Sequence, residues 1–295
     1  MFIIESFRER IRRVRNGEAR RAKYAVCLLL SAATALLASC GVLDEITEPK
    51  LFETEVRSAR LPEALDGFRI VLVSDLHADS CRNRKYLARI VERMNRLHPD
   101  LIAIAGDLTD GSVTGLAPQL EALRGLKAPY GVFGVPGNHE YYSDYRDYMA
   151  YLPTLGVTML ENSHRMIRTD FAVAGITDPA AWKRGLPGPN ISAALKGIPK
   201  TAFVLLLAHQ PRHCIAAAQL GVDLQLSGHT HGGLVWGIGP FIVKRNGGFV
   251  SGAYKVGDTV LYVSRGVAFR SRGRWGFIWR IGIPSEITLL ILRRQ

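Results

Sequence analysis

Cysteine is scarce in this chain of 295 residues, and its four cysteines show no paired spacing. Cys27 and Cys40 lie in an apolar run near the N-terminus, while Cys81 and Cys214 are far apart in the remaining sequence. A disulfide framework and a cysteine-ligated zinc site both require cysteines at short, regular spacings. The sequence therefore argues against both.

The net charge is close to zero everywhere except at the two ends of the chain. Residues 1–23 carry a net charge of +5 and residues 265–295 carry +6, so the 241 residues between them contribute only +1 to the total of +12. A nucleic-acid-binding domain usually has a basic stripe across its folded core. The distribution disfavours nucleic acid as a partner and favours contact of the basic ends with a membrane surface. Arginines that only keep the protein soluble are the alternative interpretation.

Charged residues are absent from residues 24–43. As a helix, this run would be about 30 Å long, which matches the hydrocarbon core of a bilayer. With the basic segment of residues 1–23 before it, the run predicts an uncleaved transmembrane anchor, a cytoplasmic N-terminus and an extracytoplasmic remainder. Two alternatives stay open: a lipoprotein signal that ends at Cys40, and an export signal that begins with Arg20 and Arg21.

A polar connector at residues 44–65 leads to a regular alternation of predicted strands and helices. The run Val71-Leu72-Val73 is typical of a buried strand. Apolar residues spaced as on one helical face follow between Leu87 and Met94. The alternation continues to the C-terminus, so residues 66–295 are predicted to form one α/β layered domain. Sheets of this kind bind ligands at the carboxyl ends of their strands.

Potential metal ligands follow five of the predicted strands. After the first strand, Asp75 and His77 stand two residues apart, a spacing at which strand geometry points both side chains the same way. The other four strand ends carry Asp107, Asn138 and His139, His209, and His229 and His231. Oxygen and imidazole ligands without thiolates favour Mn, Fe, Zn or Co. Five such strand ends together predict a metal site.

In order along the chain, these strand ends resemble the five-block signature of the calcineurin-like metallophosphoesterase superfamily. The blocks are Asp75-Leu76-His77, Gly106-Asp107-Leu108-Thr109-Asp110, Gly137-Asn138-His139-Glu140, His209 and Gly228-His229-Thr230-His231. The resemblance covers residues 66–292, and with its apolar N-terminal run the chain is similar to the membrane-associated bacterial branch of YkuE- and YaeI-like proteins. It implies an α/β fold in which a four-layer β-sandwich is flanked by helices. One departure, Leu234 where that branch often has Gln, concerns substrate contacts and not the metal site.

The resemblance also implies a role for each residue at the strand ends. The implied ligands are Asp75, His77 and His231 for one divalent ion, Asn138, His209 and His229 for the other, and Asp107 as the bridge between them. His139 would face the substrate as proton donor or charge stabiliser, and Asp110 would orient it. The expected cofactors are two Mn²⁺ ions, with Fe, Zn or Co as alternatives.

Together these residues predict a metal-dependent phosphoesterase of the bacterial cell membrane, with residues 66–295 as its catalytic domain. The two ions would supply a bridging hydroxide that attacks phosphorus, and His139 would protonate the leaving oxygen. The expected substrates are phosphodiesters or pyrophosphates, lipid-linked ones included. Hydrolysis of UDP-2,3-diacylglucosamine in lipid A synthesis is an alternative, although that substrate faces the cytoplasm. A non-catalytic scaffold with the same fold is the alternative from another class.

Arginine and aromatic side chains alternate within residues 265–280. A basic aromatic segment of this kind fits an interfacial patch at a membrane surface. It fits equally well a closing hairpin whose aromatic side chains pack on the core and whose arginines are solvated.

Overall fold

The computed structural model describes residues 23–32, 48–79, 84–233, 243–268, 270–273, 276–280 and 282–295, and between residues 270 and 279 it describes the backbone alone. The chain divides into two units, Met1–Ile46 and Thr47–Gln295. In the first unit, residues 23–32 form a helix whose residues are all exposed. Among the described residues, no helix is long and apolar enough to cross a membrane. Residues 1–22 of the basic segment and residues 33–43 of the predicted anchor lie outside the described residues, so the anchor stays a prediction.

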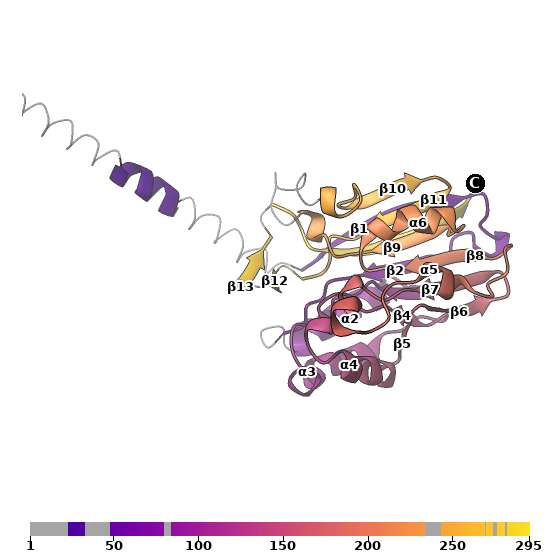
Figure 1. The fold of residues 1–295 in the computed structure, drawn as a ribbon, viewed down its shortest axis with the longest axis horizontal. Coiled ribbons are helices and arrows are strands. Elements are labelled where there is room, and N and C mark those ends of the chain that lie inside the picture. The colour runs from indigo at the N-terminus through magenta and orange to yellow at the C-terminus, as the bar shows by residue number, and fades with distance from the viewer. Residues whose placement is uncertain are drawn as a thin grey trace, which may run out of the picture. The chain divides into compact units, whose positions relative to one another are not determined.

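Two six-stranded sheets form the larger unit (Figure 1). The order of the first sheet is β1 (Lys50–Ser58), β14 (Glu286–Arg294), β2 (Arg69–Val73), β3 (Leu101–Ile104), β4 (Val132–Gly134) and β5 (Val157–Met159). The order of the second is β10 (Gly252–Val256), β11 (Thr259–Val263), β9 (Leu224–Ser227), β8 (Phe203–Leu207), β7 (Phe171–Gly175) and β6 (Ser163–Arg168). A separate hairpin joins β12 (Arg270–Gly273) to β13 (Gly276–Trp279).

Both sheets are mixed, with a parallel centre. Strands β2 to β5 run parallel in the first sheet, and β14 pairs antiparallel with β2. Strands β7, β8, β9 and β11 run parallel in the second sheet, where β6 and β10 are antiparallel edges. The carboxyl ends of β2, β3 and β4 therefore share one edge of the first sheet, and those of β8 and β9 share one edge of the second.

Helices cover the outer faces of both sheets. The helices α2 (Arg84–Arg96), α3 (Val113–Leu120) and α4 (Tyr145–Tyr151) pack on the first sheet, and α5 (Ile191–Leu195) and α6 (Cys214–Gln219) pack on the second. Because side chains alternate along a strand, Val71 and Val73 of β2 pack with α2, while Ile70 and Leu72 pack against the second sheet. This order of helix, sheet, sheet and helix confirms the predicted sandwich flanked by helices.

The helix α2 has the face that the sequence spacing predicts. Its buried residues are Leu87, Ile90, Val91 and Met94, at the positions i, i+3, i+4 and i+7. They join the cluster that covers β2 and β3. A regular apolar stripe was therefore sufficient to place this helix from the sequence.

The strand β1, in contrast, falls within the predicted connector of residues 44–65. It pairs in parallel with β14, from Lys50 with Glu286 to Ser58 with Arg294. Val56 is its one buried residue, because β1 is an edge strand and most of its side chains face solvent. A single buried apolar residue carries almost no periodicity. The folded domain therefore includes residues that the sequence pattern assigned to the connector.

Gly175 ends β7 at a point where the structure leaves no room for a side chain. An added Cβ would lie 2.4 Å from the Cβ of Leu160 and 2.6 Å from Cγ1 of Val135. We expect Gly175→Ala to lower the free energy of unfolding by about 1–3 kcal/mol, the usual cost of overpacking a core. Denaturant titration measures this change. The matched control is Gly125→Ala, whose Cβ would lie 3.3 Å from Val91 Cγ1, and an equal loss in both variants would contradict the prediction.

Candidate metal centre

The loops after β2, β3 and β9 are joined by backbone hydrogen bonds. Within the first sheet, the N–H groups of Asp75 and His77 donate to the carbonyls of Gly106 and Asp107, at 2.9 and 3.0 Å. Across the two sheets, the N–H of His229 donates to the Asp75 carboxylate at 3.1 Å. The strand ends that carry the predicted ligands are therefore in direct contact, where α/β sheets commonly bind ligands.

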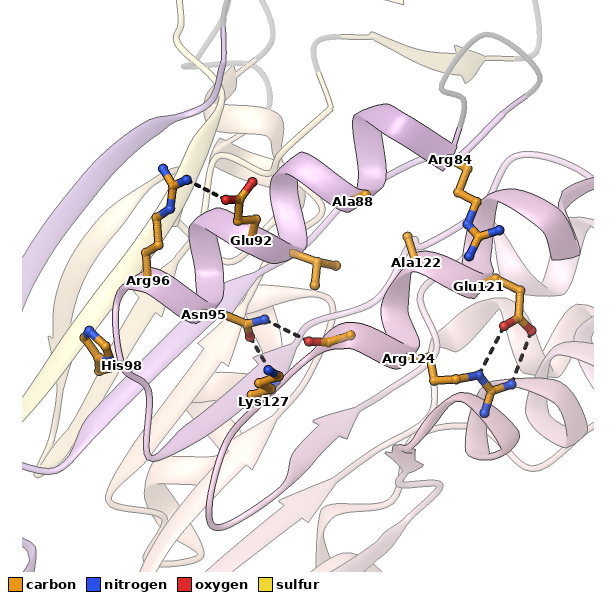
Figure 2. Close-up of a pocket in the computed structure, with 12 residues that line it drawn as sticks. Arg84, Ala88, Glu92, Asn95, Arg96, His98, Glu121, Ala122, Arg124 and Lys127 are labelled. Atoms are coloured by element: carbon orange, nitrogen blue, oxygen red, sulfur yellow. Dashed lines mark hydrogen bonds and ion pairs between the residues drawn. The ribbon is translucent and has the colours of Figure 1, made fainter.

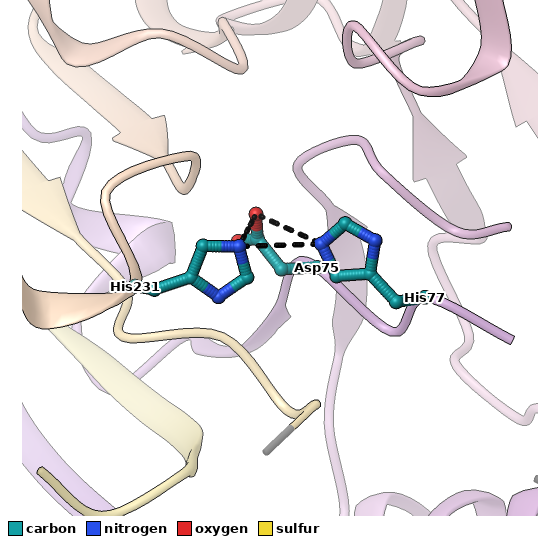
Figure 3. A group of neighbouring side chains, drawn as sticks. All are labelled: Asp75, His77 and His231. Carbon is teal, nitrogen blue, oxygen red and sulfur yellow. Dashed lines mark hydrogen bonds and ion pairs between the residues drawn. The ribbon is translucent and has the colours of Figure 1, made fainter. Parts of the chain in front are cut away.

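Asp75, His77 and His231 form the first group of converging side chains (Figure 3). The Nε2 atoms of His77 and His231 are 3.2 Å apart. They lie 3.9 and 3.5 Å from Oδ1 of Asp75. Figure 3 shows both rings with one nitrogen turned toward this carboxylate. Two imidazole nitrogens and a carboxylate oxygen that face one point suit a single cation.

The second group consists of Asp107, His209 and His229. Nε2 of His209 lies 3.1 Å from Oδ2 of Asp107 and 3.2 Å from Nδ1 of His229. The amide oxygen of Asn138 lies 3.2 Å from the same His209 nitrogen, so Asn138 supplies a further oxygen. Asp107 Oδ2 is also 3.8 Å from Nε2 of His77 in the first group. The two groups therefore share Asp107.

The pKa shifts of His229 and His231 suit a cation, while the shift of His209 runs in the opposite direction. Burial lowers the pKa of His229 to about 3, helped by the charge on His209. Burial also lowers the pKa of His231, and the Arg280 guanidinium adds to this effect. Burial opposes protonation of His209 as well, but the Asp107 carboxylate outweighs it and raises the pKa of His209. His229 and His231 are thus neutral, the form that binds metals, beside a buried carboxylate that attracts positive charge.

Asp110 holds two histidines at once. Its Oδ1 accepts hydrogen bonds from Nδ1 of His77 at 2.9 Å and from Nδ1 of His139 at 2.5 Å. Burial disfavours the Asp110 carboxylate, but these hydrogen bonds outweigh burial and keep its pKa well below the usual value. Burial likewise opposes the imidazolium of His139, but Asp107 and Asp110 raise the pKa of His139 to about 9. The contact with His139 has the geometry that the predicted orienting role requires, and the contact with His77 was not predicted.

All nine predicted site residues thus lie in one connected set of contacts. Five of them have left-handed backbone, out of seven non-glycine residues with positive φ in the described part of the chain. The five are Asp75, His77, Asp107, His229 and His231, with φ between 42° and 72°. Such conformations cost about 1 kcal/mol or more each and persist where the surrounding structure enforces them. No local sequence signal reveals this strain.

Glycines beside the predicted ligands leave room for them. A Cβ on Gly137 would lie 2.2 Å from Oδ1 of Asp107. A Cβ on Gly228 would lie 2.4 Å from Oδ2 of Asp75. Neither glycine can carry a side chain without displacing the neighbouring carboxylate, which explains why the loops have glycine at these positions.

Glu140 has a structural role that the sequence did not reveal. Its fully buried carboxylate accepts four backbone hydrogen bonds, from Asp107 at 3.1 Å, Leu108 at 2.7 Å, Thr109 at 3.3 Å and Gly137 at 2.7 Å. It thereby ties the loop after β3 to the loop after β4. Burial and the charge of Asp107 raise the pKa of the Glu140 carboxyl. The one available signal was its place in the block Gly137-Asn138-His139-Glu140.

Arg280 also belongs to this region. The sequence grouped it with the arginines of residues 265–280, as an interfacial patch or a closing hairpin. The structure buries Arg280 completely and places its Nη2 2.8 Å from Nδ1 of His231. Arg280 is therefore not part of an exposed patch, while β12 and β13 do form a hairpin.

A groove of about 840 Å³ lies elsewhere, between α2 and the 3₁₀ helix η2 (Glu121–Gly125) (Figure 2). Two of its arginines, Arg96 and Arg124, form ion pairs with Glu92 and Glu121 on the same helices. None of the nine predicted site residues lines it. The groove has no converging set of catalytic groups, so the candidate site is the centre around Asp107.

The hydrogen bonds of Glu140 predict a loss of stability when its charge is removed. Glu140→Gln removes one acceptor oxygen and turns an N–H group toward backbone donors. We expect the free energy of unfolding to fall by about 2–3 kcal/mol, since hydrogen bonds to a buried charge are lost. Denaturant titration without added metal measures it. Glu53→Gln, an exposed substitution on β1, is the control, and an equally small effect in both variants would show that Glu140 does not hold the loops.

Comparison with known proteins places the chain in a family. Residues 68–233 match the family Calcineurin-like phosphoesterase. The uncharacterized metallophosphoesterase YkuE of Bacillus subtilis is 31% identical over 277 residues, covering 89% of this chain and 93% of that protein. A Danio rerio transmembrane protein with metallophosphoesterase domain is 36% identical over 273 residues, covering 88% of this chain and 61% of that protein. An uncharacterized metallophosphoesterase of Helicobacter pylori is 36% identical over 256 residues, covering 85% of this chain and 66% of that protein.

The chain thus spans less than two thirds of the length of the last two relatives. The family match covers more than half of the chain, and the resemblance that the strand ends predicted is confirmed. The chain belongs to the calcineurin-like phosphoesterase family, whose enzyme class is the metal-dependent phosphoric ester hydrolases.

Proposed function

We propose that this chain is a membrane-associated phosphoesterase that hydrolyses phosphodiesters or pyrophosphates with two divalent metal ions. The position of Asp107 carries the proposal. Its Oδ2 lies 3.1 Å from Nε2 of His209 and 3.8 Å from Nε2 of His77, and these two histidines belong to different ligand groups. A carboxylate shared by two groups of converging ligands is the arrangement that a two-metal hydrolytic site requires.

The described residues supply ligands for both ions. We assign Asp75, His77 and His231 to one ion, Asn138, His209 and His229 to the other, and Asp107 to the bridge. Oxygen and imidazole donors fit Mn²⁺, our proposed native metal, with Fe, Zn and Co as alternatives. When bound, two such ions make a nucleophile of water near neutral pH and neutralise charge on the phosphoryl oxygens.

His139 is the proposed proton donor to the leaving oxygen. Its Nδ1 is engaged by Asp110, so Nε2 is the atom left to deliver a proton. This nitrogen lies 4.0 Å from Oδ2 of Asp107, the proposed bridge, which puts it beside the reacting centre. The His139 side chain is 15% exposed, whereas those of His77 and His209 are fully buried. It can therefore reach a substrate that the buried ligands cannot touch.

Membrane association is supported by the first unit of the chain. Within the helix at residues 23–32, large apolar side chains such as Leu28, Leu29 and Leu30 are exposed by 63–70%. Contiguous exposed apolar side chains mark contact with a membrane or a partner. Relatives from Danio rerio and Bos taurus are named transmembrane proteins. We propose an anchor at residues 24–43 in a bacterial membrane, an extracytoplasmic catalytic domain, and lipid-linked phosphate esters among its substrates.

Substitution of the bridge and of the proton donor tests the catalytic assignment. We expect Asp107→Asn to abolish Mn²⁺-dependent hydrolysis of bis(p-nitrophenyl) phosphate and to weaken binding of both ions. His139→Ala should keep both ions and lower kcat by about 10²–10⁴-fold, the usual contribution of a general acid. Metal analysis and steady-state kinetics on the full chain measure both effects.

The control for this pair is His164→Ala, because His164 donates to the carbonyl of Ala194 and belongs to neither ligand group. It should retain metal and rate. If Asp107→Asn kept two ions while His139→Ala lost them, the assigned roles would be wrong. Faster turnover of UDP-2,3-diacylglucosamine than of any phosphodiester would favour the lipid A alternative.

A second test concerns the anchor. A reporter fused after Gln295 should be active on the extracytoplasmic side alone, because the basic residues before the uncharged run retain the N-terminus inside. The mass of the membrane-bound chain should be that of the uncleaved sequence, and Cys40→Ser should change it by the difference between the two side chains alone. Reporter activity in the cytoplasm would exclude the proposed orientation. A shorter, lipid-modified chain that depends on Cys40 would instead establish the lipoprotein signal.

A further inference from the structure

The first strand of the larger unit begins next to the metal centre. Lys50, the first residue of β1, donates from its N–H to the carbonyl of Ser285 at 2.9 Å and pairs with Glu286. The N–H of Glu286 donates in turn to the carbonyl of Gly266 at 2.9 Å. A Cβ on Gly266 would lie 2.7 Å from Cβ of Asp75, so this glycine packs against a predicted ligand. A series of direct contacts thus leads from Lys50 to the first ligand group.

The hairpin of β12 and β13 begins and ends at the same place. Two residues before β12, the N–H of Ala268 donates to the carbonyl of Asp75 at 2.9 Å. Directly after β13, Nη2 of Arg280 lies 2.8 Å from Nδ1 of His231. Among the described strands, β12 and β13 pair with each other alone and join neither large sheet. Both ends of this separate hairpin are therefore attached beside the metal centre.

The residues of the hairpin combine positive charge with aromatic rings. Residues 268–279 contain three arginines, four aromatic residues and no acidic residue. Arg270 pairs with Trp279, and Arg272 pairs with Phe277. Residues that are paired across two antiparallel strands share a face, as do residues two apart along one strand. One face of the hairpin therefore brings together two arginines and two aromatic residues, a composition that suits the interface of a membrane.

Large apolar side chains are exposed at the same edge of the larger unit. Leu51, the second residue of β1, is 47% exposed, and Tyr142 is 57% exposed. The ring centroid of Tyr142 lies 5.2 Å from that of His139, the proposed proton donor. Exposed apolar side chains around a site mark contact with a membrane or a partner. The apolar surface at this edge thus extends to the reacting centre.

The chain between this edge and the proposed anchor is short. Residues 44–47 separate residue 43, the last of the proposed anchor, from Glu48. The Glu48 carboxylate pairs with Arg93 of α2 at 3.1 Å, so the larger unit already holds this residue. Even fully extended, the five chain steps between residues 43 and 48 reach about 18 Å. An anchor at residues 24–43 therefore keeps the start of β1 close to the bilayer surface.

We propose that this edge is the membrane-docking surface of the catalytic domain, with the hairpin of β12 and β13 on an anionic bilayer and the metal centre beside the phosphate groups of the lipids. The excess of positive charge in the hairpin complements the negative surface of such a bilayer. The inference rests on the proposed function and deepens it, because it makes membrane-embedded phosphodiesters the substrates that the centre meets first.

Fluorescence quenching by brominated lipids tests the docking. Residues 1–43 contain no tryptophan, so the quenching reports on the rest of the chain. The full chain in vesicles of brominated phosphatidylglycerol should be quenched, and added salt should reduce the quenching because it screens exposed charges. Joint replacement of Trp275 and Trp279 by Phe should remove most of it. Absence of quenching in the unmodified chain would overturn the proposal. Quenching that survives both replacements would also overturn it, because another part of the domain would then lie on the bilayer.

Kinetics with two substrates connect the docking to catalysis. Hexadecyl p-nitrophenyl phosphate resides in the vesicle, whereas bis(p-nitrophenyl) phosphate stays in water. We expect joint replacement of Arg270 and Arg272 by Gln to lower kcat/KM for the vesicle substrate by about 10–30-fold. Each basic group near an anionic surface contributes roughly a fivefold factor. The rate for the soluble substrate should not change, because neither arginine belongs to the metal centre.

The matched control replaces Arg57 and Arg294 by Gln, which removes the same charge at the opposite ends of β1 and β14. It should change neither rate. Equal losses on both substrates in the hairpin variant, or no loss on either, would contradict the docking role. Should the hairpin variant fail to fold, the quenching of the unmodified chain and its dependence on salt decide.

The two proposals fail in different ways. A chain that releases no p-nitrophenol from either substrate, or that does not stay in the membrane, would contradict the proposed function. A membrane-bound chain that hydrolyses the soluble substrate but shows no quenching by brominated lipids would contradict this inference alone.

Discussion

Three buried carboxylates, those of Asp75, Asp107 and Glu140, set the geometry where the two sheets meet. A buried charge is costly unless it is paired or hydrogen-bonded. Here the loops themselves satisfy the charges: backbone N–H groups donate from His229 to Asp75, from His139 to Asp107 and from four residues to Glu140. A loop that moved would leave one of these charges without its donors, which costs several kcal/mol by order of magnitude. The positions of the predicted ligands, and the strained backbone that several of them adopt, depend on these hydrogen bonds.

Each proposed ion takes its ligands from both sheets. For the first, Asp75 and His77 follow β2 of one sheet, and His231 follows β9 of the other. For the second, Asn138 follows β4, while His209 and His229 follow strands of the second sheet. A ligand that binds the folded state but not the unfolded state stabilises the folded state. The proposed ions would therefore stabilise the contact between the two sheets as well as take part in the chemistry, in addition to the apolar cluster between the sheets.

The sequence predicted those features that arise from residues close together in the chain. The core strands are continuous apolar runs, and the predicted ligands stand directly after them, so neighbouring residues were enough to indicate both. It missed β1, where the cause of strand formation is pairing with β14 near the other end of the chain. It also missed the roles of Glu140, three of whose four partners lie 31–33 positions away, and of Arg280, whose partner lies 49 positions away. No nearby residue records such contacts, and left-handed backbone at Asp or His is likewise imposed by tertiary structure.

The place of β14 in the first sheet has a consequence for how the chain is made. This strand comes after all the other described strands along the chain, yet it lies between β1 and β2. A ribosome releases a chain from its N-terminus, so this sheet cannot close until residues 286–294 have emerged. A product truncated before β14 would present β2, the strand that leads to Asp75 and His77, as an open edge. Unpaired edges are templates for aggregation, so an incomplete chain is expected to be lost to quality control rather than to persist with partial activity.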